Sequence, residues 1–239
     1  MKLLIVNPNS TESMTEALKP VVTRLLPPGF EATYFTGPAS SPKSINDAAT
    51  STASAEACFP LLQPLVREHD GVLVACYSAH PLVAMLRRVA APAGVVVVGI
   101  MEASVHHALA LGDRFAIVTT GAAWEPLLAR GVAELLGCDG DGGCARLAGV
   151  RGTGVDADRL HSLPRRELER RMAEATVALL RRAPDVDVVC LGCAGMAGLR
   201  EAVAAAAASE VGRHVAVVDA VEAGTVVLCG LVTVRMRHA

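Results

Sequence analysis

The stretch that decides the fold is residues 71–78, GVLVACYS, in which an apolar run of strand length ends in Cys76. Residues 188–195, VVCLGCAG, repeat this layout and carry Cys193 in the place of Cys76, 117 residues further along the chain. Continuous apolar runs that are bounded by turns and separated by helix-like stretches are typical of parallel strands buried on both faces. Both stretches therefore predict a buried strand that ends at a cysteine, after which a helix begins.

Further apolar runs of strand length recur along the chain, with helix-like segments between them. The predicted strands are Leu3–Val6, Gly71–Ala75, Val95–Ile100, Phe115–Thr119, Val186–Leu191 and Val215–Val218, with a possible extra strand at Glu31–Phe35. A helix is expected to begin at Ser10 or Thr11, either of which can cap it, and to end at residues 27–29, PPG. The Arg and Glu residues of 165–171 favour an exposed helix face with i,i+4 ion pairs.

The two halves of the chain resemble each other beyond the cysteine stretches. Ile5–Asn7 aligns with Ile117–Thr119, and residues 99–103 align with 218–223, so each half reads strand, helix, strand ending in Cys, helix, strand. We predict an α/β fold of two similar lobes related by a pseudo-two-fold axis, each with a short parallel sheet flanked by helices. The first lobe is expected to hold residues 1–102 plus 220–239, and the second residues 103–219.

Composition excludes several classes of protein. With 52% hydrophobic and 19% charged residues, the 239-residue chain is not a disordered one. A net charge of -2 leaves no basic surplus for nucleic acid, and no apolar run approaches the roughly 18 residues of a membrane span. The seven cysteines are an odd number, which favours reduced thiols in a cytoplasmic compartment.

Cys76 and Cys193 are the candidate catalytic residues. Ligands of open parallel α/β sheets bind beyond the carboxyl ends of the strands, where both cysteines are expected. If the lobes face each other, the two thiols oppose one another across a cleft, an arrangement suited to removing a proton from one face of a carbon and returning it to the other. We expect the following helix N-termini to lower the thiol pKa values and to offer backbone N–H groups to a developing enolate. The alternative is that both are buried packing residues.

Other polar residues admit two interpretations each. Asn7–Thr11 and Thr119–Gly121 end equivalent strands, and they either bind a carbonyl or carboxylate or simply cap helices. His80 either orients the thiol or recognises substrate, or it only starts a helix. Cys190 and Cys193 form a C-x-x-C, but Cys190 lies inside a strand and there is no second pair, so we expect no metal site.

Three stretches resemble the aspartate/glutamate/hydantoin racemase superfamily, with the hydantoin and allantoin racemase branch nearest. They are residues 4–15, LIVNPNSTESMT, residues 118–120, VTT, and residues 191–196, LGCAGM. The resemblance implies an Asp/Glu racemase-like fold, a homo-oligomer and a cofactor-free reaction with Cys76 and Cys193 as the two bases. It also implies a set of substrate contacts: Asn9, Ser44, Ile45, Ser78, Thr119, Thr120, Ala194 and Gly195. Tyr77 and His80, which follow Cys76 closely in the chain, are further candidate substrate contacts.

The stretch after the first cysteine departs from the bacterial hydantoin racemases. It reads Tyr77-Ser78-Ala79-His80-Pro81, which looks more like the fungal members of the branch. We expect racemisation at C5 of a five-membered cyclic ureide, a 5-substituted hydantoin or allantoin, without metal or cofactor. The alternatives are an aspartate or glutamate racemase, whose carboxylate substrate would need a cation that the motif loops lack, and a non-catalytic small-molecule binding protein.

Overall fold

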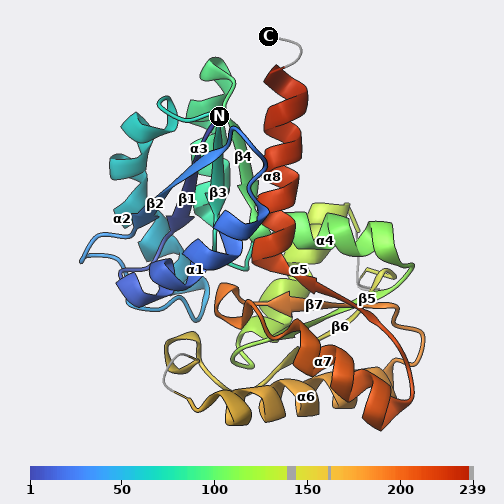
Figure 1. Ribbon diagram of the computed structural model, residues 1–239. Helices are drawn as coiled ribbons and strands as arrows, with labels where there is room; N and C mark the ends of the chain where they lie inside the picture. Colours follow the sequence, from blue (N-terminus) through green and yellow to red (C-terminus); the bar gives the residue numbers. More distant parts are fainter. Residues whose placement is uncertain (139–143, 161–162, 237–239) are drawn as a thin grey trace. The chain divides into compact units, whose positions relative to one another are not determined.

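The computed structural model describes residues 1–138, 144–160 and 163–236, and most of its helices and strands are labelled in Figure 1. The chain divides into two compact units. Unit 1 is Met1–Ala103 together with the segment from Val221 onward, and unit 2 is Ser104–Ala220. Within the described ranges, no helix combines the length and the apolar character that crossing a membrane requires.

Unit 1 is built around a parallel sheet of four strands in the order β2-β1-β3-β4. Its elements are β1 (Lys2–Asn7), α1 (Glu12–Leu25), β2 (Glu31–Thr36), α2 (Ala48–Val66), β3 (Gly71–Val74), α3 (Pro81–Ala90), the short helix η1 (Ala91–Ala93), β4 (Val96–Gly99) and nearly all of α8 (Ala220–Met236). Successive strand residues point to opposite faces, so each face has its own helices. Leu4, Val6, Val72 and Val74 pack with the buried side chains of α2 and α3.

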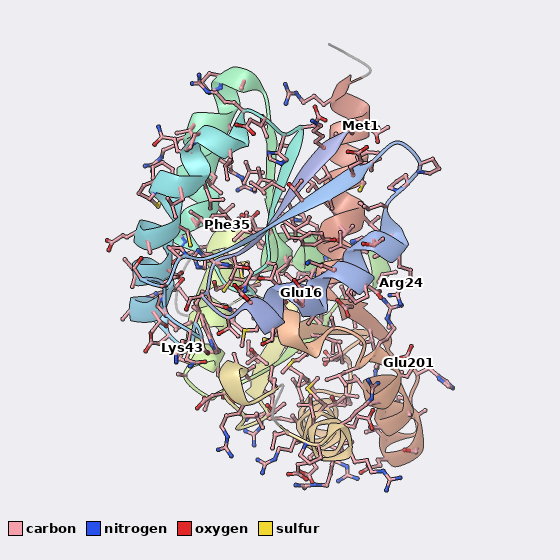
Figure 2. All side chains as sticks on the ribbon, turned by 60° about the vertical axis from the view of Figure 1, so that its left-hand side comes forward. Met1, Glu16, Arg24, Phe35, Lys43 and Glu201 are labelled. Carbon is pink, nitrogen blue, oxygen red and sulfur yellow. The ribbon has the colours of Figure 1, made fainter. Side chains whose placement is uncertain are left out.

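The opposite face of this sheet is covered by α8 and α1. A Cβ atom at Gly71 would lie 2.9 Å from side-chain atoms of Leu228 and Val232, which shows how closely α8 approaches β3. Arg24, labelled in Figure 2, donates a 2.5 Å hydrogen bond from α1 to Glu222 in the first turn of α8. The two helices are thereby tied together on one face.

Unit 2 has a second parallel sheet of four strands, in the order β6-β5-β7-β8. Its elements are most of α4 (Ile100–Leu111), β5 (Phe115–Thr119), α5 (Trp124–Leu136), β6 (Leu147–Gly152), the short helix η2 (Ala157–Arg159), α6 (Arg165–Arg182), β7 (Val188–Gly192), the short helix η3 (Ala194–Met196), α7 (Arg200–Ala206), the π-helix η4 (Ala207–Val211) and β8 (Ala216–Asp219). One face packs Ala116, Val118, Val189 and Leu191 against α6 and α7.

The two sheets have the same topology, which confirms the prediction of two similar α/β lobes. In unit 1, Val74 pairs with Val6 on one side and Gly99 on the other. In unit 2, Leu191 pairs with Val118 and Asp219. Cys76 and Cys193 each come two residues after these central positions, so they occupy equivalent places in the two units.

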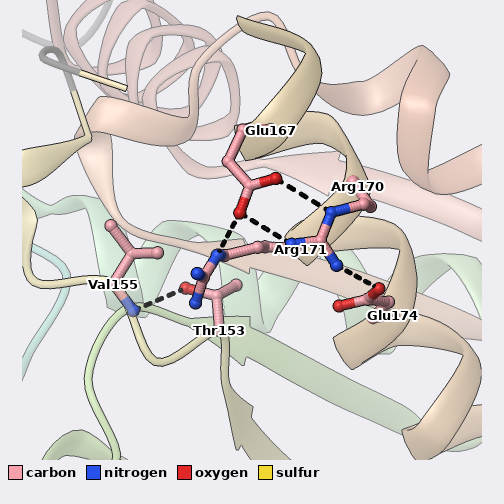
Figure 3. A network of polar contacts seen from close by, with 6 residues as sticks. All are labelled: Thr153, Val155, Glu167, Arg170, Arg171 and Glu174. Carbon is pink, nitrogen blue, oxygen red and sulfur yellow. Dashed lines mark hydrogen bonds and ion pairs between the residues drawn. The ribbon is translucent and has the colours of Figure 1, made fainter. Parts of the chain in front are cut away.

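The Arg- and Glu-rich part of α6 is a solvated helix face, as the sequence predicted. Arg170 pairs with Glu167 at 2.7 Å and also with Glu174, and Arg171 pairs with Glu167 at 2.8 Å (Figure 3). The hydrogen bonds from Arg170 and Arg171 lower the pKa of Glu167 to about 2. Exposed pairs at these spacings contribute little to stability, so this network is not evidence for a site.

Two local features differ from the predictions. The edge strand β6 was not predicted, because LAGVRG contains two glycines and an arginine and is only half-buried. Thr11 is the N-cap residue of α1, but its hydroxyl makes no capping hydrogen bond. It donates instead to the backbone oxygen of Lys43 at 2.7 Å.

Candidate active site

In unit 1, Cys76 lies just beyond the carboxyl end of β3. The N–H of Ala75 still donates to the oxygen of Val6 at 2.8 Å, so the ladder ends one residue before the cysteine. Cys76 is half-buried, and its sulfur lies 3.5 Å from the hydroxyl oxygen of Ser78. The N–H of Ser78 also donates to the oxygen of Cys76 at 3.1 Å. These contacts form a tight turn that holds the thiol at the edge of the sheet.

In unit 2, Cys193 directly follows β7 and is the N-cap residue of η3. Its oxygen accepts from the N–H of Met196 at 3.0 Å, and its sulfur accepts from the N–H of Gly195. Its half-buried side chain packs against the core of unit 2. Ser78 and Gly195 hold equivalent positions, so each thiol has a polar group two residues along the chain.

The prediction that a helix N-terminus lowers the thiol pKa is wrong for Cys193. Burial raises the pKa of Cys193 to about 11, and the N–H of Gly195 offsets only part of this rise. The reason is that η3 has a single turn, whereas removing a thiolate from water opposes ionisation strongly. Cys193 is therefore a protonated thiol near neutral pH.

The start of α3 is not an open donor site either. Its first residue, Pro81, has no N–H, while the N–H groups of Leu82 and Val83 donate to Nδ1 and to the backbone oxygen of His80. The expectation that this helix start stabilises an enolate is thus wrong. His80 is the N-cap of α3.

Both ring nitrogens of His80 have partners inside unit 1. Nδ1 accepts from Leu82 at 3.3 Å, which leaves the ring proton on Nε2, 3.0 Å from the hydroxyl oxygen of Ser54. Ser54 in turn donates to the oxygen of Ser51 at 2.9 Å. Burial lowers the pKa of His80 to about 4, so the ring is neutral near pH 7. These contacts assign His80 a structural role, and its contact with substrate stays a prediction.

Asn9 is buried beside the end of β1 with its amide held in one direction. Its Oδ1 accepts from Asn7 Nδ2 at 3.0 Å and from the N–H of Thr11 at 2.9 Å. Its Nδ2 donates to the sulfur of Met14 at 3.1 Å, and a thioether is a weak acceptor. Oδ1 thus accepts two hydrogen bonds within unit 1, whereas the partner of Nδ2, the Met14 sulfur, is a weak acceptor.

The loop after β2 is attached to this asparagine segment. The N–H of Ser10 donates to the oxygen of Pro42 at 3.0 Å, and Thr11 reaches Lys43 as described above. Ile45 is buried, and Ser44 donates to Asn46 at 3.0 Å. The predicted contacts Asn9, Ser44 and Ile45 thus belong to one connected part of unit 1.

Several residues that support this segment cannot be recognised from the sequence. The oxygen of Pro8 accepts from Ser41 at 2.6 Å and from the sulfur of buried Cys58 at 3.3 Å. Asn7 Nδ2 also reaches Thr15 at 3.1 Å. Only the polar NPNST run indicated a site here; nothing in the sequence connects it with residues 41 and 58.

In unit 2, the predicted contacts gather around Cys193. The hydroxyl of Thr119 donates to the oxygen of Gly192, the residue before Cys193, at 2.8 Å. Thr120 is buried next to it, and its oxygen accepts from the N–H of Gly154 at 3.2 Å. Ala194 and Gly195 form the turn after the cysteine. Tyr77 and Ser78 take the corresponding places after Cys76, and both are buried in unit 1.

The C-x-x-C does not form a ligand pair of the usual kind. Cys190 is fully buried inside β7, and its sulfur lies 3.8 Å from the oxygen of Ser104. Among residues 1–138, 144–160 and 163–236, no group of three or more His, Cys, Asp or Glu side chains could hold a metal ion.

Comparisons with known proteins agree on one family. Residues 3–228 match the model of the family described as Asp/Glu/Hydantoin racemase. The chain is 34% identical to protein C1F7.10 of Schizosaccharomyces pombe, over 99% of this chain and 94% of that protein. It is also 34% identical to protein DCG1 of Saccharomyces cerevisiae, over 85% and 86%. Among solved structures, the allantoin racemase AllR of Pseudomonas fluorescens superposes with a TM-score of 0.81 and 29% identity, covering 98% of this chain and 92% of that one.

Proposed function

The chain belongs to the Asp/Glu/hydantoin racemase family, as an enzyme of the racemase and isomerase class, and we propose that it racemises a five-membered cyclic ureide at C5. The substrate is a 5-substituted hydantoin or allantoin, and Cys76 and Cys193 are the two acid–base groups. The observation that carries this proposal is the equivalent placement of the two cysteines at the carboxyl ends of equivalent strands. A protein that only binds its ligand has no use for such a pair.

The reaction moves one proton on each side of the ring carbon. The thiolate of Cys76 takes the C5 proton and becomes a thiol, while the bonding electrons pass into the adjacent ring carbonyl as an enolate. The thiol of Cys193 then gives its proton to the opposite face of C5 and becomes a thiolate. The high pKa of Cys193 supports this assignment, because a thiol that keeps its proton near neutral pH is ready to act as the acid. The roles reverse for the other enantiomer.

Asn9 supports a ring with carbonyl groups. Its fixed amide offers Nδ2 as a donor, and a donor of this kind can hold a ring carbonyl and stabilise the negative charge that develops on it. An amino-acid substrate would need a cation for its carboxylate. The stretches 7–11, 76–80, 119–121 and 192–196 contain no Lys or Arg, which favours the neutral ring.

The test is a substrate screen in deuterated water that reads optical rotation and deuterium incorporation at C5 together. Allantoin and a set of 5-substituted hydantoins should lose optical rotation with uptake of one deuterium per inversion, without added cofactor. Aspartate and glutamate, run as matched controls, should keep both their rotation and their hydrogen. Racemisation of an amino acid with no change in any ureide would overturn the substrate assignment. Affinity for a ureide without deuterium uptake would support a binding protein instead.

A further inference from the structure

Helix α8 carries an apolar surface that the fold of unit 1 does not explain. Residues 223–234, AGTVVLCGLVTV, form twelve successive helical positions without a charged side chain. A helix that is apolar all round is normally buried on all sides. Here one side packs on the sheet, through the buried Leu228 and Val232, and the other side does not.

The outer side of α8 is an exposed apolar surface. Val226 and Leu231 are each 47% exposed and Val234 is 59% exposed. They make up half of the six large hydrophobic residues that are exposed in the described parts of the molecule. A groove of about 330 Å³ runs along Val226, Gly230 and Val234 and is bordered on its other side by Leu25 and Pro27.

Gly230 lies in the middle of this surface and has no internal reason to be glycine. A Cβ atom at Gly224 would lie 2.8 Å from Leu73, so that glycine lets α8 approach the sheet. A Cβ atom at Gly230 would meet nothing within 4 Å, and the backbone there does not have a positive φ. Glycine is among the poorest helix formers, so close approach of another backbone is the remaining physical reason for it.

We propose that this surface of α8 binds the same surface of a second copy of the chain, with the two helices antiparallel and crossing at Gly230. The outer stripe reads Val226, Gly230 and Val234 at spacings of four residues, so it is symmetric about the glycine. A two-fold axis at Gly230 sets Val226 of each copy against the partner's Val234. Leu231 of each copy then lies against the partner's Leu231, on the side of the stripe away from Leu25.

The charges at the two ends of the stripe favour the antiparallel arrangement. Glu222 continues the stripe at its N-terminal end, and Arg235 follows it at its C-terminal end. Antiparallel pairing brings the acidic end of one helix to the basic end of the other, whereas parallel pairing would put arginine beside arginine. Glu222 already accepts from Arg24, and Arg235 already donates to the backbone oxygen of Ala93 at 3.5 Å, but a carboxylate and a guanidinium can each make several hydrogen bonds. This inference is independent of the proposed reaction.

The test compares the mass of the wild type in sedimentation velocity with that of Leu231→Arg. The wild type should sediment as an even multiple of the 24.7 kDa chain, and Leu231→Arg should halve that mass, because an unpaired charge inside the interface should raise the dissociation constant at least about hundredfold. Leu61→Arg is the matched control, because Leu61 on α2 is 48% exposed and lies outside the surface. Val226→Glu repeats the test with the opposite charge, and circular dichroism checks that each variant is folded.

Gly230→Ala distinguishes close packing from mere exposure. In the Leu231→Arg background it should raise the melting temperature by about 2 °C, since alanine is the better helix former. In the wild-type background it should weaken association by about tenfold, since the added methyl group meets the partner helix. A monomeric wild type, an unchanged mass of Leu231→Arg, or a Gly230→Ala variant that associates as tightly as the wild type would each overturn the proposal.

Discussion

The Nε2 atom of His80 lies 3.0 Å from the Oγ atom of Ser54, which connects the start of α3 to α2 inside unit 1. The histidine is 3% exposed, and burial lowers its pKa to about 4 from an ordinary value of 6.5. The sequence left two roles open for His80, one at the thiol or substrate and one at the start of a helix, and this contact favours the second. The ring closes the N-terminus of a helix and stays neutral, so it is poorly suited to accept a proton from substrate.

The first prediction concerns the pH dependence of stability. His80 binds a proton below about pH 6.5 in the unfolded chain, but only below about pH 4 in the folded chain. The contribution of the neutral ring to the free energy of unfolding is therefore complete above pH 6.5 and is lost as the pH falls toward 4. The loss should be on the order of 3 kcal/mol. Urea unfolding at several pH values should show it in the wild type. His80→Asn, which can still cap the helix, should lack this component, although other groups still titrate in both proteins. Its racemisation should persist; abolished racemisation in a folded His80→Asn variant would contradict the structural role.

The second prediction concerns the direction of the Asn9 amide. Asn9→Asp keeps an oxygen for Asn7 and Thr11 but replaces the Nδ2 donor by an acceptor oxygen. We expect kcat/KM for the ureide to fall by about tenfold to hundredfold, because one hydrogen bond to a charged or polar group is lost. The melting temperature should change little. Asn9→Ala removes both functions and should lower both activity and stability. An Asn9→Asp variant with wild-type kcat/KM would exclude Asn9 as a substrate donor.

The third prediction tests the two thiols separately. A serine hydroxyl is too weakly acidic to serve as a base near neutral pH, so Cys76→Ser and Cys193→Ser should each lose racemisation in both directions. Each variant should still exchange the C5 proton with deuterated water for one enantiomer only, the one that faces the surviving cysteine. Exchange by Cys76→Ser should need a higher pH than exchange by Cys193→Ser, because the remaining Cys193 must first lose its proton. The two variants should prefer opposite enantiomers. Cys58→Ser, which changes a buried thiol that binds Pro8, is the matched control and should keep both activities. The same preference in both active-site variants would refute the two-base assignment.

The fourth prediction uses the raised pKa of Cys193. The proton stays on the sulfur below about pH 11 and is lost above it, so the acid needed for one half of the reaction is present throughout the neutral range. Titration of the thiolate absorbance, as the difference between the wild type and Cys193→Ser, should show a midpoint near pH 11. A midpoint at the ordinary thiol pKa would mean that substrate-free Cys193 is better solvated than its packing against the core of unit 2 indicates.

The fifth prediction concerns metal at the C-x-x-C. Because Cys190 is buried in the middle of β7, we expect no bound zinc and no loss of racemisation after treatment with a chelator. Elemental analysis of the purified protein measures its zinc content, and a racemisation assay measures its activity before and after the chelator is added. Stoichiometric zinc that is lost together with activity would contradict this expectation.

Much of the fold could be predicted from local sequence. Buried parallel strands must be continuous apolar runs, so β1, β3, β5 and β7 were recognisable one by one, and the repeated cysteine stretch indicated the duplication. The edge strand β6 escaped because a half-exposed strand needs no such run. The site was predicted only as a set of residues. That the Cys76 and Cys193 clusters meet in one cleft remains a prediction.

What the sequence by itself determined is which residue types stand at the carboxyl ends of the strands: two cysteines, Asn9 and the threonines 119 and 120. What only the tertiary structure decided is the state of each group. The ring of His80 is neutral and hydrogen-bonded, the amide of Asn9 is held in one direction, and Cys193 keeps its proton. The physical reason is that hydrogen-bond direction and pKa depend on the neighbours and the loss of water, and residues such as Ser54 and His80, 26 positions apart, become neighbours only when the chain folds.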